Sequence, residues 1–367
     1  MFTNTVSNLR LIAAVFLFFC FGSITRADPF VPTFEKLSPG VWAAVRNDNP
    51  RFPVMGTATF VISGAGVVVF DGGGSDKMAG RIIDKIKSLT PLPVTHVAIS
   101  HWHGDHNFGI HRYLEEYPNV QVIAHTFTHS VMTGTRINYI EDNRTFVPEF
   151  RKTLEDRLAS GKGEDGKPLP TFLQARYQQM LADADMVHED FGKVKVTLPT
   201  ITFDDKLTVR SGNRVIEFIY LGDGNTAGDI MMWLPEEKII SAGDTVVHPV
   251  PYAFNMPPRK WASTLRAVIA LDYKILVPGH GDIQRDTEYV DLLIETSEGI
   301  ADQRDKMLSD GISEEDAEKA LDYSPYEERY TGGDPYLAYF YQAWFKGPFS
   351  KAAFKALKGI PMVTPDR

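Results

Sequence analysis

The sequence predicts an α/β fold that carries a helical insertion and a helical C-terminal extension. Strand and helix patterns alternate between residues 58 and 125. A helical pattern without strands fills residues from about 130 to 193, and helices dominate again from residue 287 onward. Alternating strands and helices are typical of a sheet that is covered by helices.

The first part of the chain predicts strands on either side of one amphipathic helix. Residues 58–70, ATFVISGAGVVVF, predict a hairpin that turns at residues 63–66. Residues 94–100, VTHVAIS, and 120–125, VQVIAH, predict buried strands. Between them, residues 77–89 predict a helix because apolar side chains recur there at helical spacing. These side chains are Met78, Ile82, Ile83, Ile86 and Leu89.

The insertion is predicted to contain two helices, one on each side of the loop sequence GKGEDGKP. Side chains at helical spacing mark both of them. They are Phe146, Phe150, Leu154 and Leu158 before the loop, and Phe172, Arg176, Tyr177, Met180 and Leu181 after it. We therefore expect an inserted helical unit rather than a linker.

Short strands return after the insertion. They are predicted within residues 196–220 and in the sequences KIISAG, 238–243, and KILVPG, 274–279. The final helical region contains the aromatic sequence YLAYFYQAWF. We divide the chain after its leader into a main domain, residues 28–300, and a helical extension, residues 301–367.

The first 27 residues are predicted to be a secretory signal peptide. Arg10 precedes an apolar run, LIAAVFLFFCFG, that is too short to span a bilayer, and a small residue, Ala27, ends the segment. Cleavage there predicts a periplasmic or secreted protein without stable membrane insertion. An uncleaved N-terminal anchor is the alternative. The single cysteine, Cys20, would leave with the signal, so any metal must be held by His, Asp, Glu, Asn or backbone groups.

The composition favours a globular protein that acts on a small molecule. Hydrophobic residues make up 43% of the chain and charged residues 23%, which allows a core of ordinary size. The formal net charge of -9 argues against nucleic acid as a partner, because binding to a phosphate backbone depends on excess positive charge. The sequence does not indicate an oligomeric state.

One dense group of polar residues follows a predicted strand. Residues 100–109, SHWHGDHNFG, contain His101, His103, Asp105 and His106. Open α/β sheets bind ligands at the carboxyl ends of their strands, and zinc accepts imidazole and carboxylate ligands. The two histidines at alternate positions can face one metal ion, and the adjacent Asp–His pair can face a second. We therefore predict a metal centre here.

The order H-x-H-x-D-H resembles the metallo-β-lactamase superfamily. Three residues that follow other predicted strands also match the order of polar residues in that superfamily: Asp71 after VVVF, Asp244 in AGD and His280 in PGH. The resemblance covers about residues 40–285. It implies a four-layer αβ/βα sandwich, the metallo-β-lactamase fold, with the site at one edge between the two sheets.

Asn225 departs from that resemblance. It lies within residues 221–229, LGDGNTAGD, at the position where the superfamily usually has a third histidine ligand of the first metal. Site one then consists of His101, His103 and Asn225. An amide oxygen is a weaker and harder donor than imidazole, so we expect this site to bind its metal weakly.

Site two of the resemblance is complete. It consists of Asp105, His106 and His280, and Asp244 can bridge it to site one. We expect two zinc ions per chain. Two alternatives stay open: a harder metal such as manganese or iron at site one, or one metal at site two alone.

Four other polar side chains lie near these motifs. Asp223 could add a ligand to site one, although an aspartate in a turn is more often a turn former. His248, four residues after Asp244, could line the substrate pocket or hold a loop. Structural roles are expected for His125 and His129.

The resemblance implies metal-assisted hydrolysis, in which a metal-bound hydroxide attacks the substrate and Asp105 orients it. The bridging Asp244 is more similar to thioesterases, lactonases and phosphodiesterases of the superfamily than to its β-lactamases. We expect a small ester, lactone or amide-type substrate, with β-lactam antibiotics as the alternative. Persulfide dioxygenases of the superfamily hold iron with the histidine that Asn225 replaces, which argues against that activity. A metal-binding protein without catalysis is the alternative from another class.

Overall fold

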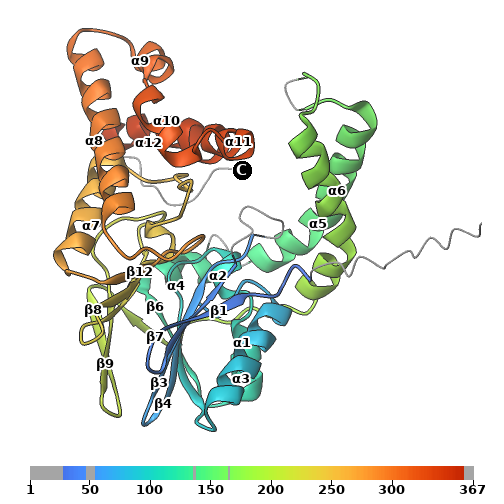
Figure 1. Cartoon of the computed structure of the whole chain (residues 1–367), viewed down its shortest axis with the longest axis vertical. Coiled ribbons are helices and arrows are strands. Elements are labelled where there is room, and N and C mark those ends of the chain that lie inside the picture. The colour runs from blue at the N-terminus through green and yellow to red at the C-terminus, as the bar shows by residue number, and fades with distance from the viewer. Residues whose placement is uncertain (1–27, 47–53, 135–137, 164–165, 359–367) are drawn as a thin grey trace, which may run out of the picture.

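The computed structural model describes residues 28–46, 54–134, 138–163 and 166–358 (Figure 1). The predicted signal peptide, with Cys20, lies outside these residues. Within them, no helix combines the length and the apolar character that crossing a membrane requires.

The first sheet of the described chain has seven strands that lie in sequence order. Neighbours are antiparallel from β1 to β4 and parallel from β4 to β7. The strands are β1 (Thr33–Ser38), β2 (Val41–Val45), β3 (Ala58–Ser63), β4 (Gly66–Phe70), β5 (Val94–Ala98), β6 (Gln121–His125) and β7 (Ile201–Phe203).

The second sheet has five strands in the order β12-β11-β10-β9-β8. The pair β11 and β12 is parallel, and the other neighbours are antiparallel. The strands are β8 (Lys206–Ser211), β9 (Arg214–Ile219), β10 (Met231–Leu234), β11 (Ile239–Ser241) and β12 (Ile275–Val277).

The two sheets pack face to face around a shared apolar core. Phe70 of β4 stacks on Phe218 of β9 with ring centroids 6.3 Å apart. Val68 and Ile123 of the first sheet belong to the same buried cluster as Met232 of the second. Side chains on one face of each sheet therefore form the middle of the molecule.

Helices cover the outer face of each sheet. Helices α1 (Asp76–Leu89) and α3 (Ile110–Glu116) pack on the first sheet, and α7 (Pro258–Ala270) and α8 (Glu288–Ser309) pack on the second (Figure 1). The sequence of layers is helix, sheet, sheet, helix. This arrangement confirms the predicted four-layer αβ/βα sandwich.

Helix α1 forms where the apolar spacing predicts it. The Ser75 hydroxyl caps its first turn by accepting a hydrogen bond from the Met78 amide at 3.1 Å. Four of the five predicted apolar side chains are buried against the first sheet, whereas Leu89, at the last position of the helix, is exposed. The helix leads the chain to β5 and so to the histidine-rich loop.

The insertion consists of α5 (Tyr139–Ser160) and α6 (Thr171–Phe191), as the sequence predicts. Leu154, Leu173 and Tyr177 bury one another in a small core of their own. The side chain of Phe146 lies outside what the structure describes. A shorter helix, α4 (Thr126–Thr133), connects β6 to this unit.

The C-terminal extension contains α9 (Glu314–Ala320), α10 (Ser324–Thr331), α11 (Pro335–Phe340) and α12 (Gly347–Lys355), with a π-helical segment at Tyr341–Lys346. Residue 300, where we placed the domain boundary, lies inside α8. Phe345 and Phe349 of the extension share one core with Trp261 of α7 and Val290 of α8. The extension is therefore packed into the outer layer of the second sheet.

Candidate metal centre

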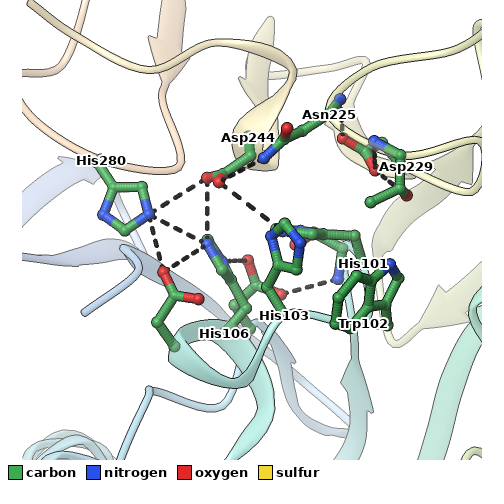
Figure 2. Close-up of polar contacts among 12 residues, drawn as sticks. His101, Trp102, His103, His106, Asn225, Asp229, Asp244 and His280 are labelled. Carbon is green, nitrogen blue, oxygen red and sulfur yellow. Dashed lines mark hydrogen bonds and ion pairs between the residues drawn. The ribbon is translucent and has the colours of Figure 1, made fainter. Parts of the chain in front are cut away.

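The predicted ligands meet at one edge of the sandwich, where several strands end (Figure 2). Asp71 follows β4, and the loop after β5 carries His101, His103, Asp105 and His106. The short helix α2 (Gly104–Asn107) holds the last two of these residues. Asp244 follows β11 and His280 follows β12. Because those two strands run in parallel and end side by side, the two side chains lie close together.

His106 lies at the middle of the group and is fully buried. Its Nδ1 is 2.8 Å from Asp71 Oδ2. Its Nε2 lies 3.1 Å from Asp244 Oδ1 and 3.3 Å from His280 Nε2. The Asp71 carboxylate thus fixes the back of the ring, and Nε2 faces the other ligands.

Asp105 faces the same point from α2. Its Oδ2 lies 3.1 Å from His280 Nε2 and 3.5 Å from His106 Nε2. Its side chain is 23% exposed, whereas that of Asp244 is 2% exposed. Of these two carboxylates, Asp105 is therefore the one that solvent or substrate can reach.

The other side of the centre contains His101 and His103. His101 Nε2 lies 2.8 Å from His103 Nδ1 and 3.7 Å from Asp244 Oδ2. The Ser100 hydroxyl is 3.0 Å from His101 Nδ1 on the opposite side of the ring. His101 is therefore held between a hydroxyl and a second imidazole, with one carboxylate at longer distance.

Asn225 reaches this centre from the loop between β9 and β10, and it is buried. Its side-chain Nδ2 donates to Asp244 Oδ2 at 3.3 Å, as Figure 2 shows. Its Oδ1 has no hydrogen-bond partner among the described residues. The structure therefore places Asn225 beside the predicted bridging carboxylate, with a buried amide oxygen that a metal or a water can still use.

A buried carboxylate, Asp229, holds the Asn225 loop. Its Oδ2 accepts from the Asn225 amide at 2.7 Å, and its Oδ1 accepts from the Thr226 amide at 2.9 Å. Burial raises the pKa of Asp229 to about 7, against the opposing effect of these hydrogen bonds. Asp229 was not identified from the sequence, because it accepts from amides three and four residues before it, whereas a turn aspartate usually bonds to backbone that follows it.

The pKa values of His101 and His106 are shifted in opposite directions. Burial, followed by the neighbouring His103 and His106, lowers the pKa of His101 well below its ordinary value. Burial acts in the same direction on His106, but Asp244, Asp105 and Asp71 outweigh it and raise that pKa well above the ordinary value. Cationic charge is therefore most favoured at the carboxylate-rich side.

Two glycines bring the backbone close to the ligands. A Cβ at position 56 would lie 2.5 Å from the His106 ring, and one at position 279 would lie 2.1 Å from Asp244 Oδ1. Asp71 has a left-handed backbone with φ of 60°, and its Oδ1 accepts from the Ser100 amide at 2.8 Å. A non-glycine residue in that conformation is strained, so the bonds to Ser100 and His106 must hold it.

The donor set fits a metal ion. The described residues contain two groups of three side chains whose ligand atoms, within each group, lie within 4.8 Å of one another. One group is Asp105, His106 and His280, and the other is His101, His106 and Asp244. The first group matches predicted site two. The second contains His101 of predicted site one, and His103 of that site lies beside it, with its Nδ1 2.8 Å from His101 Nε2. Buried imidazoles and carboxylates of this kind suit zinc.

The other polar side chains near the motifs have partners of their own. The two Asp223 oxygens accept from Tyr220 and Lys260 at 2.8 and 2.9 Å, so the carboxylate is occupied away from the centre. The His125 ring accepts from the Phe127 amide and caps α4, in keeping with the predicted structural role.

His248 lies beside the centre without facing it. Its amide donates to the His280 carbonyl at 3.0 Å, and its ring packs on Tyr289 at 4.8 Å between centroids. Its Nδ1 is 3.8 Å from Asp282 Oδ2. These contacts hold the loop that carries His280, and none of them points to the predicted substrate contact.

Tyr252 was not identified from the sequence. Its ring centroid lies 5.0 Å from that of His280, and its side chain is buried. Tyr252 lies in the long connection between β11 and α7. Nothing in the local sequence PVPYAF marks this aromatic side chain as a neighbour of a metal ligand, because only the folded connection brings the two together.

Comparison with known proteins agrees with this geometry. A family model described as the metallo-beta-lactamase superfamily matches residues 51–280. The chain belongs to the metallo-beta-lactamase superfamily. It is accordingly a hydrolase-like protein, and the match includes every predicted metal ligand.

The curated relatives match only part of the chain. It is 29% identical over 94 residues to an atrochrysone carboxyl ACP thioesterase of Pseudocercospora fijiensis, covering 25% of this chain and 28% of the relative. It is 31% identical over 100 residues to the lactamase-like protein notP of an Aspergillus species, covering 26% and 31%. The chain thus spans about a third or less of these relatives.

Solved structures match over a longer range with lower identity. A metallo-beta-lactamase from Pontibacter korlensis is 17% identical, with a TM-score of 0.49 over 73% of this chain and 99% of that one.

Proposed function

We propose that this protein is a metal-dependent hydrolase that cleaves a small ester, lactone or amide-type substrate and uses zinc, with one tightly held ion and a second, weaker one. The observation that carries the proposal is the convergence of Asp105, His106 and His280 within 4.8 Å, with Asp244 against both histidines. Manganese or iron at the weaker site remains an outcome of metal analysis.

The protein residues have separate tasks in this proposal. A bound metal ion supplies a polarised substrate oxygen and an acidified water at neutral pH. Asp105 is partly exposed, and His106 and His280 outweigh its burial and lower its pKa. It is therefore ionised at neutral pH and can accept a hydrogen bond from the attacking water. Asp71 keeps the His106 ring in its orientation.

The curated relatives favour a thioester as a second candidate substrate. The relative from Pseudocercospora fijiensis is named an ACP thioesterase, and a relative from Passalora fulva with the same name is 32% identical over 103 residues. An ester and a thioester place the same kind of carbonyl carbon beside Asp105. The same site therefore suits both, and β-lactam cleavage is the alternative.

Metal analysis combined with a substrate panel tests this proposal. Zinc per chain is measured in the purified protein, and turnover of a neutral aryl ester, a thioester, a lactone and a chromogenic β-lactam is followed. We expect zinc to be bound and at least one acyl substrate to be cleaved. His280→Ala should lose both properties, whereas His188→Ala, which removes an exposed histidine on α6, should keep both.

Two outcomes would contradict the proposal. Bound metal with no turnover of any substrate would favour a metal-binding protein without catalysis. Turnover that survives in His280→Ala at the wild-type rate would place the active site elsewhere. Cleavage of the β-lactam alone would keep the hydrolase and replace the substrate class.

We further propose that the protein is exported and acts in the periplasm or outside the cell. The support is the order of positive charge, apolar run and small residues in residues 1–27. N-terminal sequencing of the native protein should begin near Asp28. A native chain that begins at Met1 in the soluble cytoplasmic fraction would contradict export.

A further inference from the structure

A row of aromatic rings leads away from the metal centre. The ring of Tyr252, 5.0 Å from His280, packs on Trp344 at 4.7 Å between centroids. Trp344 packs on Phe340 at 5.2 Å. We call Tyr252, Trp344 and Phe340 the aromatic row. It connects a predicted metal ligand to the C-terminal extension by direct contact.

The helix geometry of the extension fixes this row. In an α-helix, the Trp344 carbonyl would accept from the amide of residue 348, but that residue is Pro348 and has no amide hydrogen. The chain is π-helical over Tyr341–Lys346, and the Trp344 carbonyl instead accepts from the Ala253 amide at 3.1 Å. This bond ties Trp344 to the residue after Tyr252. Short π-helical segments are frequent at functional sites.

A cation lies at the far end of the aromatic row. The Arg176 guanidinium, from α6 of the insertion, lies 4.8 Å above the Phe340 ring and 5.3 Å above the Tyr336 ring. It also donates to the Tyr336 hydroxyl. Within the described ranges, no carboxylate forms an ion pair with it. Arg176 is therefore held by aromatic contacts, which leave guanidinium donors for another group.

A second arginine lies close enough to Arg176 to affect its charge. Burial lowers the pKa of Arg176 to about 10, against the opposing effect of the phenols of Tyr252 and Tyr177, and Arg46 lowers it further. Arg46, directly after β2, is buried. Burial disfavours the charged form of Arg176, and a bound anion would stabilise that form.

Part of the aromatic surface beside the row is open to solvent. Phe254 is 37% exposed and packs on Trp344 at 6.0 Å. Tyr339 is 39% exposed and packs on Phe340 at 5.6 Å. Large apolar side chains are seldom left exposed in a group next to a site unless they contact something. Phe254 and Tyr339 are thus accessible to a ligand and Trp344 is partly so, whereas Tyr252 and Phe340 lie buried behind them.

We propose that the aromatic row and Arg176 select the substrate: an acyl compound with an aromatic or flat apolar body and an anionic group, of carboxylate type, at the end away from the metal. The reacting carbonyl lies beside Asp105 and His280, the apolar body lies along Tyr252 and Trp344, and the anion pairs with Arg176. This inference rests on the proposed hydrolase function. A guanidinium suits a carboxylate because its donors match both oxygens.

A matched pair of substrates tests the inference. One is a neutral aryl ester, and the other is the same ester with a free carboxylate on the aromatic acyl group. In the zinc-loaded wild type, kcat/KM should be higher for the anionic ester. Arg176→Gln should reduce that preference by on the order of 10–100-fold, mainly through KM, since a hydrogen bond to a charged group contributes about 1.5–3 kcal/mol.

Three variants separate anion binding from a purely structural role. Arg259→Gln removes an exposed arginine of α7 that pairs with Asp302 and Asp305, and it should leave the preference unchanged. Arg176→Lys should restore part of it. Trp344→Leu should weaken both esters through KM. If Arg176→Gln lowers kcat/KM equally for both esters, Arg176 is only a structural link and the inference is wrong.

A binding experiment tests the anion site separately from the proposed hydrolase function. Calorimetry with a non-hydrolysable aromatic carboxylate needs no turnover. Binding to the wild type that is lost in Arg176→Gln would support the anion site even if no ester is cleaved. Equal binding to both proteins, or binding to neither, would overturn it, whatever the hydrolase assay shows.

Discussion

The two sides of the metal centre hold their histidines in different ways. His280 lies within 3.3 Å of carboxylate oxygens from Asp105 and Asp244, and His106 is additionally fixed by Asp71 at 2.8 Å. His101, in contrast, has a histidine at 2.8 Å and its nearest carboxylate at 3.7 Å. Both sides contain histidines, but only one has carboxylates within 3.3 Å of them. We therefore expect the carboxylate-rich side to bind a cation more strongly.

The largest expected effect comes from removing a ligand on the carboxylate-rich side. His280→Ala and Asp105→Ala should each lower zinc affinity and turnover by more than about 100-fold, because changes behind the ligands already cost about 10–100-fold. Zinc per chain after dialysis and initial rates measure the effect, and circular dichroism checks the fold. A variant that kept full metal and full turnover would show that the stronger side has been misplaced.

A smaller effect is expected on the side of the centre that contains His101, His103 and Asn225. Asn225→His should supply an imidazole where the amide now donates to Asp244, so the more labile metal should need on the order of 10–100-fold more chelator for release. Activity need not rise, since the water or substrate position changes as well. A chelator titration of both proteins measures it. Release at the same chelator concentration would contradict the assigned position of Asn225.

The smallest effect concerns the loop behind Asn225. Asp229 has a pKa of about 7 in the fold against an ordinary 3.8, so between these values the folded protein keeps a proton that the unfolded chain has lost. Its contribution to stability is present at low pH and is lost as the pH rises towards 7. Asp229→Asn removes this dependence.

Urea unfolding of the metal-free wild type and Asp229→Asn measures the pH-dependent contribution of Asp229 to the free energy of unfolding. From pH 5 to pH 8, the stability of the wild type relative to Asp229→Asn should fall by on the order of 2 kcal/mol. Titrating groups that do not interact with Asp229 are common to both proteins and cancel in the difference. A difference that does not change with pH would mean that Asp229 is already ionised in the folded loop at pH 5.

Local sequence patterns predicted the strands, helix α1 and the histidine-rich loop, whereas the family resemblance implied the four layers and the later ligands Asp244 and His280. The period of Met78, Ile82 and Ile86 indicates the buried face of α1. Open α/β sheets bind ligands at the carboxyl ends of their strands, which indicated the loop after β5. The meeting of this loop with His280 was implied by the family resemblance, because β5 and β12 belong to different sheets. The two imidazoles predicted for site one, His101 and His103, also lie together, with ring nitrogens 2.8 Å apart.

The residues that sequence reasoning missed depend on long connections. Tyr252 and Trp344 meet because Pro348 cannot donate to the helix and the freed carbonyl bonds to Ala253. In the sequence, Arg176 is part of a helical pattern and nothing more, and its position over Phe340 follows from the packing of the insertion against the extension. Such contacts between distant segments leave no period in the sequence.

The position of residue 300 inside α8 has a consequence for how the molecule opens. One apolar core contains Trp261 of α7, Val290 of α8 and Phe345 of the extension, so these segments should unfold as one cooperative unit. Trp344 then cannot swing away like a surface loop without disrupting the outer layer of the second sheet. The rings of the aromatic row are therefore already in place before a ligand binds. Binding then costs less conformational entropy, because these side chains do not have to be ordered.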